Sequence, residues 1–132
     1  MRCKGLDGMW GLENVSHKNL DIWVLGIKLS KEIYKLTEQF PDCEKFGITS
    51  QLRRASVSIP ANIAEGAARQ TDKEFLSFLH ITRGSISEVD TLLVVCLELN
   101  YCKSADLEII DKLLKEIYNK TNALIKRIKE KH

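Results

Sequence analysis

Apolar residues recur at alternating steps of three and four along most of this chain, a pattern typical of amphipathic helices. The first such stretch spans about residues 19–39. Its main stripe consists of Ile22, Leu25, Leu29, Ile33, Leu36 and Phe40. A second apolar set widens the arc, namely Leu20, Trp23, Val24, Ile27 and Tyr34. Either this helix is central or its other side meets another subunit. Pro41 ends it, because the residue before a proline is disfavoured in the α conformation.

A second helix is predicted over about residues 44–68, with a proline inside it. Its inward residues are Ile48, Leu52, Ala55, Ile59 and Ile63. Pro60 has no N–H and leaves the Ser56 carbonyl without its helical donor, which costs roughly 3 kcal/mol unless another group compensates. We therefore expect a kink or break there, with the hydroxyls of Ser56 and Ser58 bonding the freed backbone groups. Gly66 either permits close approach of another backbone or winds the helix down.

A third helix is predicted over about residues 72–99, opened by a capping box at Thr71 and Glu74. Its seam consists of Phe75, Leu79, Thr82, Ile86, Val89, Leu93 and Cys96. The pair Gly84-Ser85 in its middle has weak helix propensity. We interpret this pair as a crossing point where another helix comes close.

The fourth helix is predicted over about residues 104–130, with Ser104 as its cap. Its seam consists of Leu107, Ile110, Leu114, Ile117, Thr121, Leu124 and Ile128. Helices joined by short connections neighbour one another antiparallel. The predicted fold class is therefore all-α, an antiparallel up-down-up-down four-helix bundle over residues 18–132, preceded by a flexible N-terminal leader at residues 1–17.

Composition fits one well-ordered domain. The chain has 132 residues, of which 44% are hydrophobic and 29% charged, with two prolines. Its net charge of +2 is far from that of a dedicated nucleic-acid binder, so any basic surface must come from local clustering. The four cysteines form no C-x-x-C pair and no Glu-x-x-His occurs, which argues against zinc and di-metal centres. We expect no metal and no cofactor.

Catalysis and membrane insertion also lack sequence support. Ser56, Ser58 and Cys96 have no histidine placed to assist them, so we expect no catalytic residue, no small-molecule substrate and no enzyme. No segment approaches the roughly 20 apolar residues of a membrane span, and the N-terminus lacks a signal-peptide pattern. The expected localisation is cytoplasmic, with no membrane partner.

Several segments together resemble a known family. They are Leu20-Asp-Ile-Trp23, Ile33-Tyr34-x-Leu-Thr-x-x-Phe-Pro41, Gln51-Leu-Arg-Arg-Ala-Ser-Val-Ser-Ile-Pro-x-Asn-Ile-Ala-Glu-Gly66, and Phe75-Leu-x-Phe-Leu79 with Arg83-Gly-Ser85. Over about residues 18–128 the chain is similar to the bacterial four helix bundle proteins, first noticed as reading frames inside intervening sequences of large-subunit ribosomal RNA genes. It departs from them at residues 66–69, where a further glycine often precedes the arginine.

The resemblance implies a bundle protomer that assembles as a ring-like homopentamer, with no established enzymatic activity. The fold is also similar to the accessory variability protein of diversity-generating retroelements. That protein is a pentamer whose basic surface binds a reverse transcriptase and nucleic acid. A reverse-transcriptase-type nucleoprotein is therefore one partner that the likeness implies.

Arg53 and Arg54 are the sharpest candidates for function. As adjacent helical residues they point about 100° apart and do not face one partner together. In the structural interpretation, one of them pairs with Glu65 or Glu88 and the other is solvated. In the alternative, these arginines contact phosphates. Residues 120–132 carry five cations against Glu130, a net +4, which also fits simple complementation of the helix dipole.

Three sets of residues are thus singled out. The nucleic-acid-binding set is Arg53, Arg54, Arg69, Arg83, Lys126, Arg127 and Lys129. The oligomer-interface set is Trp23, Ile27, Tyr34 and Pro60, and the structural set is Asn62, Glu65, Gly66 and Glu88. We expect a non-enzymatic oligomeric binding or scaffold protein that contacts RNA or a nucleoprotein through a symmetric basic surface. The alternative is a purely structural or protein-interaction homo-oligomer without nucleic acid.

Overall fold

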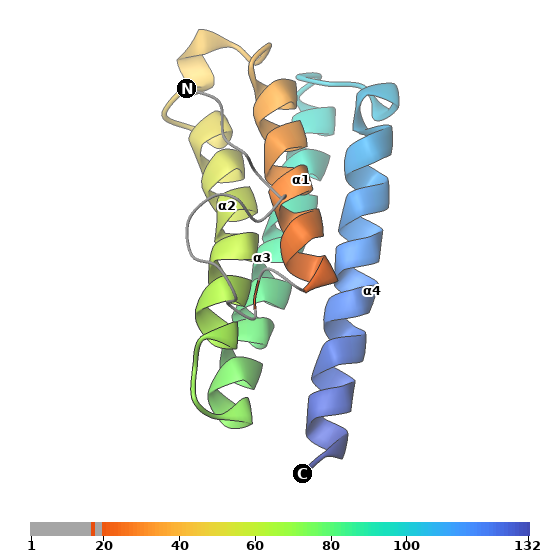
Figure 1. Cartoon of the computed structure of the whole chain (residues 1–132). Coiled ribbons are helices and arrows are strands. Elements are labelled where there is room, and N and C mark those ends of the chain that lie inside the picture. Colours follow the sequence, from red (N-terminus) through yellow and green to blue (C-terminus); the bar gives the residue numbers. More distant parts are fainter. Residues whose placement is uncertain (1–16, 18–19) are drawn as a thin grey trace.

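The computed structural model describes His17 and residues 20–132, and this part of the chain is all-α with no strand. The elements are α1 (Asp21–Thr37), the 3₁₀ turn η3 (Asp42–Glu44), α2 (Ile48–Ala67), α3 (Asp72–Glu98), the 3₁₀ turn η4 (Ser104–Leu107) and α4 (Glu108–Glu130). Figure 1 shows the four α-helices side by side, with successive connections at alternate ends. Apart from His17, the predicted leader lies outside the described residues.

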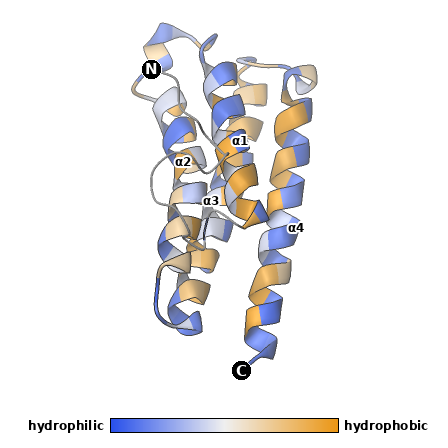
Figure 2. Cartoon of the chain, in the orientation of Figure 1, coloured by the Kyte–Doolittle hydropathy of each residue, from blue (hydrophilic) through white to orange (hydrophobic). Residues whose placement is uncertain are grey.

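One apolar stripe from each helix forms a single core, and Figure 2 shows apolar and polar residues alternating along the ribbons. The predicted seams supply this core with few exceptions: Leu25, Phe75 and Leu124 are half-buried rather than buried. Ile125 lies in the core beside Leu124 although the seam pattern did not include it. Each fully buried Leu or Ile contributes about 1.5–3 kcal/mol, so these stripes are the main source of stability.

Pro60 does not break α2, which is continuous from Ile48 to Ala67. The expected compensation comes from α1 instead: the Ser30 hydroxyl lies 3.1 Å from the freed Ser56 carbonyl, and it shares its one proton between this carbonyl and that of Gly26 in its own helix, also at 3.1 Å. The hydroxyls of Ser56 and Ser58 donate to other carbonyls, so the sequence prediction named the wrong serines. Ser30 reaches Ser56 because Gly26, one turn earlier, lets the two helices approach closely. A Cβ at Gly26 would lie 3.2 Å from Pro60 Cδ.

The α2 and α3 helices approach closely at two points. Ser58 Oγ and Ser85 Oγ form a hydrogen bond at 2.8 Å, and a Cβ at Gly66 would lie only 2.6 Å from Phe78 Cβ. The close-approach interpretation of Gly66 is therefore the correct one. Gly84 is different, because a Cβ there would meet nothing within 4 Å. The predicted crossing point is wrong for Gly84, since the contact is made by its neighbour Ser85.

Helix ends follow local backbone chemistry. Thr71 Oγ1 accepts from the Glu74 N–H at 3.2 Å, which is the threonine half of the predicted capping box. The α3 helix ends in a Schellman motif: Asn100 has a positive φ of 60°, and the next N–H donates to the Cys96 carbonyl at 2.9 Å. Ser104 is not the cap of α4, because it begins η4 and α4 starts at Glu108.

The connections at one end of the bundle are tied together through Tyr101. Its hydroxyl donates to Glu44 Oε2 at 2.7 Å, and its ring packs 5.6 Å from that of Phe40. The hydrogen bond lowers the pKa of the Glu44 carboxyl and raises the pKa of Tyr101 to about 12. The turn before α2 is thereby joined to the turn before α4.

The two glycines give a matched test of this packing. Gly66→Ala should lower the free energy of unfolding by about 1–3 kcal/mol, because the new methyl group overlaps Phe78. Gly84→Ala should raise it by about 0.5–1 kcal/mol, because it removes a flexible residue from an open helix surface. Denaturant unfolding measures both. Equal effects of the two substitutions would contradict the assigned α2–α3 approach.

Candidate nucleic-acid interface

Arg53 is a clamp between α2 and the end of α1. Its Nε donates to Thr37 Oγ1 at 2.7 Å and its Nη2 donates to the Tyr34 carbonyl at 3.3 Å. The guanidinium also lies 4.4 Å from the centroid of the Tyr34 ring. A cation at a helix C-terminus complements the partial negative charge of the last carbonyls. Arg53 thus has a structural role, with α1 as its partner rather than the predicted Glu65 or Glu88.

Arg54 and Glu88 are exposed, and neither has a hydrogen bond or ion pair within the described residues. Glu65 is paired with a residue just beyond the end of its own helix, since Arg69 Nη2 lies 3.1 Å from its carboxylate. The Arg69 guanidinium also stacks 4.9 Å from the centroid of the Phe78 ring. These contacts leave Arg54 as the unpartnered arginine of the motif in α2.

Asn62, the remaining polar residue of this string, donates from Nδ2 to the Ser58 carbonyl at 2.8 Å. Asn62 therefore stabilises the backbone of α2 next to the hydrogen bond between Ser58 and Ser85.

Arg83 joins α3 to α4. Its Nη1 donates to Asn122 Oδ1 at 3.0 Å, and its Nη2 lies 3.0 Å from His80 Nδ1. Partial burial, with the positive charges of Arg83 and Lys129, lowers the pKa of His80. A neutral His80 can accept the hydrogen bond from Arg83. The positive charges of Arg83 in α3 and Lys129 in α4 thus both act on His80.

The last turns of α4 carry the least compensated positive charge. Residues 108–116 contain three acids and two lysines, a net −1, whereas residues 117–132 contain five cations and one acid, a net +4. Lys126, Arg127 and Lys129 are exposed and have no ion pair within the described part of the chain. We call these three residues and Arg83 the basic end.

Two contacts hold α4 in place near the basic end. His132 Nε2 lies 2.9 Å from Asp72 Oδ2 at the start of α3, and this hydrogen bond lowers the pKa of Asp72. Lys120 Nζ lies 3.3 Å from Asp21 of α1 and 3.2 Å from Glu116, and these carboxylates raise its pKa. The free cations therefore stand on a helix that is fixed to both neighbours.

The described residues contain no group of three or more His, Cys, Asp or Glu side chains that could hold a metal ion. Cys96 lies in the core, and burial raises the pKa of its thiol to about 11, so it is protonated and packs as an apolar residue. Among these helices none is long and apolar enough to cross a bilayer.

The predicted interface residues have different environments. Trp23 and Ile27 are half-buried, and the Trp23 ring packs 5.2 Å from that of His17. Tyr34 is 43% exposed. Pro60 is buried against α1 inside the protomer, where a second subunit would not reach it.

Residues 18–123 match the sequence model of a family described as 23S rRNA-intervening sequence protein. The chain belongs to this family. A solved structure from Bacteroides thetaiotaomicron, a protein with unknown function from the S23 ribosomal protein family, is similar with a TM-score of 0.71. The two chains are 23% identical over 80% of this chain and 98% of the other, a likeness that shows the fold alone. Comparison with the curated proteins finds no match.

In this member of the 23S rRNA-intervening sequence family, sequence reasoning missed a second stripe on α3. Ser85 touches α2 and serves as the reference point of this stripe. Ile81 lies four residues before it, and Leu92 and Leu99 lie seven and fourteen residues after it. Ile81 and Leu99 are 51% and 49% exposed. Their common spacing was the available signal, but the stronger core seam concealed it. We call this surface, with Arg54, Ala61 and Glu88, the α2–α3 face.

The contribution of the Arg53 contacts to stability can be separated from the effect of losing one positive charge. Arg53→Ala should lower the free energy of unfolding by about 1–3 kcal/mol, because it removes two hydrogen bonds and the ring contact. Arg53→Lys should recover only part of this loss, because an ammonium lacks the planar fork. The control Arg127→Ala should change it by less than about 0.5 kcal/mol. Equal losses at both positions in chemical denaturation would refute the clamp.

Proposed function

We propose that this protein is a non-enzymatic homo-oligomer that contacts RNA, free or within a nucleoprotein, through its basic end. The proposed protomer is an antiparallel up-down-up-down bundle, and the proposed setting is the cytoplasm. The supporting observation is the set of exposed, unpaired cations at the end of α4, namely Lys126, Arg127 and Lys129. The relation of the family to 23S rRNA intervening sequences agrees with RNA as the ligand.

The chemistry of the basic end favours contact with phosphates over reading of bases. A net +4 over residues 117–132 would attract a polyanion and release its counterions. No aromatic side chain lies among Lys126, Arg127 and Lys129, so stacking on bases has no support there. Arg83 is the fourth cation of the basic end, although its guanidinium is already held by Asn122. Such a surface would bind RNA through its backbone with little sequence preference.

Oligomerisation is supported by the α2–α3 face. This face exposes Ile81 and Leu99 together with two charges of opposite sign, Arg54 and Glu88, that have no partner within the described protomer. Between subunits these two charges can satisfy each other, with Arg54 of one subunit beside Glu88 of the next. The resemblance to the four helix bundle proteins favours five subunits, which would bring five basic ends together.

A purely structural or protein-interaction oligomer is the second candidate. It is favoured by the same α2–α3 face, because another protein subunit can bury these exposed apolar residues without any nucleic acid. The two candidates share an assembly and differ in whether the basic end has a ligand.

RNA binding should depend steeply on salt. Fluorescence anisotropy with a labelled RNA hairpin should give a measurable affinity at low salt that falls as salt rises. The variant K126Q/R127Q/K129Q should bind more weakly and reduce the slope of log K against log salt by about 2–3, because each phosphate contact contributes about 0.7–0.9.

The control K28Q/K31Q/K112Q removes the same charge from exposed positions on α1 and the first half of α4, without touching the basic end. It should keep most of the slope. No measurable affinity of the wild-type protein at low salt would leave the scaffold candidate standing. Equal losses in both triple variants would show that net charge alone governs binding.

Assembly can be tested by exchanging charges. Arg54→Glu and Glu88→Arg should each lower the solution mass measured by light scattering, because each places like charges across the proposed contact. The double variant R54E/E88R should restore the mass, since it re-forms the pair in reverse. The charge-matched control K31E, on the outer side of α1, should leave the mass unchanged. A wild-type monomer, or single variants of unchanged mass, would rule out this interface.

A further inference from the structure

A groove runs between α3 and the first half of α4, away from the α2–α3 face. It consists of two adjoining hollows of about 360 Å³ each, which share Asp90, Asp111 and Leu114. Along α4 the lining extends from Ser104 in η4 to Asn119. We call it the α3–α4 groove.

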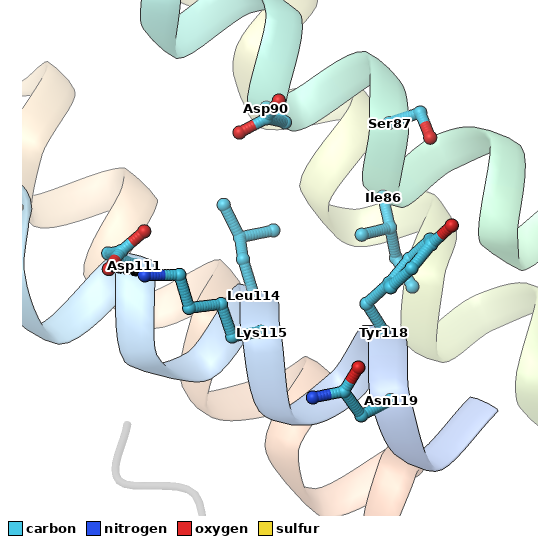
Figure 3. Close-up of a pocket in the computed structure, with 8 residues that line it drawn as sticks. All are labelled: Ile86, Ser87, Asp90, Asp111, Leu114, Lys115, Tyr118 and Asn119. Carbon is cyan, nitrogen blue, oxygen red and sulfur yellow. Dashed lines mark hydrogen bonds and ion pairs between the residues drawn. The ribbon is translucent and has the colours of Figure 1, made fainter. Parts of the chain in front are cut away.

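The floor of the groove is apolar. Figure 3 shows Leu114 of α4 and Ile86 of α3 directed toward the opposite helix, with the Tyr118 ring beside Ile86. Leu93 and Leu97 continue the floor toward η4, and Val94 forms part of the wall while remaining 51% exposed. An exposed valine beside a hollow over the core is a surface that gains free energy when an apolar partner covers it.

The rim of the groove is acidic. Asp90 and Glu108 line it from opposite helices, and neither has an ion pair or hydrogen bond to the rest of the described chain. Asp111 is partly neutralised by Lys115, whose Nζ lies 2.8 Å from its carboxylate (Figure 3). Two carboxylates thus stand unpaired above an apolar floor.

We propose that the α3–α4 groove binds a basic amphipathic helix of a partner protein. The lined part of α4 and η4, residues 104–119, is about 24 Å long, which matches a helix of about four turns. A helix laid in a groove places its apolar residues on the floor at steps of three and four. Lysines or arginines on its flanks would then meet Asp90 and Glu108.

Two other occupants of the groove are RNA and a second copy of the chain. RNA is excluded from this groove because its phosphates would face the unpaired Asp90 and Glu108. The proposal therefore concerns a second surface, and it does not depend on RNA binding at the basic end. A second copy of the chain is the competing occupant, which solution mass can detect.

The test uses a fluorescent peptide of about 15 residues, capped at both ends, with leucines spaced three and four apart and lysines elsewhere. Anisotropy with the full chain should show saturable binding. The variant D90K/E108K should weaken it by at least about tenfold, because two attractive contacts become repulsive. The control E38K/D42K changes net charge equally at exposed, unpaired positions outside the groove, and should weaken it by less than about threefold.

A second pair of variants tests the floor. Val94→Ser should weaken the peptide by about threefold or more, whereas Ile109→Ser, an exposed apolar position of α4 outside the groove, should not. A glutamate-for-lysine peptide should not bind. Equal losses in groove and control variants, or binding of the acidic peptide, would overturn the proposal. A fall in solution mass of D90K/E108K would overturn it in favour of a second copy.

Discussion

The close contact of α1 with α2 at Gly26 and Pro60 is the constraint on which the bundle depends. Pro60 gives up one hydrogen bond inside α2, and Ser30 of α1 supplies a donor for the freed Ser56 carbonyl. The two helices lie close together at this point, where a Cβ at Gly26 would be 3.2 Å from Pro60 Cδ. A helix with an interior proline is stable here because a second helix completes it. The position of α1 along α2 is thereby fixed to a single turn, and Arg53 fixes it again at the other end of the contact.

Much of the fold could be predicted from the sequence, because each helix carries a periodic apolar stripe. Ile59 and Leu79 are fully buried where the pattern places them. The sequence predictions fail where a residue from another helix makes the contact that was expected from a residue nearby in the chain. The sequence shows that the Ser56 carbonyl lacks a donor, but only the packing of α1 shows that Ser30 provides it. Gly84 and Gly66 look alike in sequence, and only the path of the adjacent helix separates an open surface from a close approach.

The candidate site could be predicted less well, because charge alone does not reveal which cations are already engaged. Arg53 and Arg54 are identical neighbours in the sequence, yet Arg53 bonds to α1 and Arg54 has no partner within the described residues. Arg83 is likewise held by Asn122, a residue 39 positions away that periodicity does not link to it. The lysines at the end of α4 were predictable, since a C-terminal run of cations on a surface stripe has few local partners.

The charge arrangement of α4 has a consequence for how ligands arrive. Carboxylates dominate its first turns and cations its last, so each end complements the partial charge of the helix backbone there. The same arrangement gives α4 an acidic end and a basic end separated by about 30 Å of helix. Charges arranged in this way favour the approach of a polyanion to the basic end of a helix and of a polycation to its acidic end. The charges of a single helix thus favour one orientation of an approaching ligand. This electrostatic preference weakens as added salt shortens the Debye length.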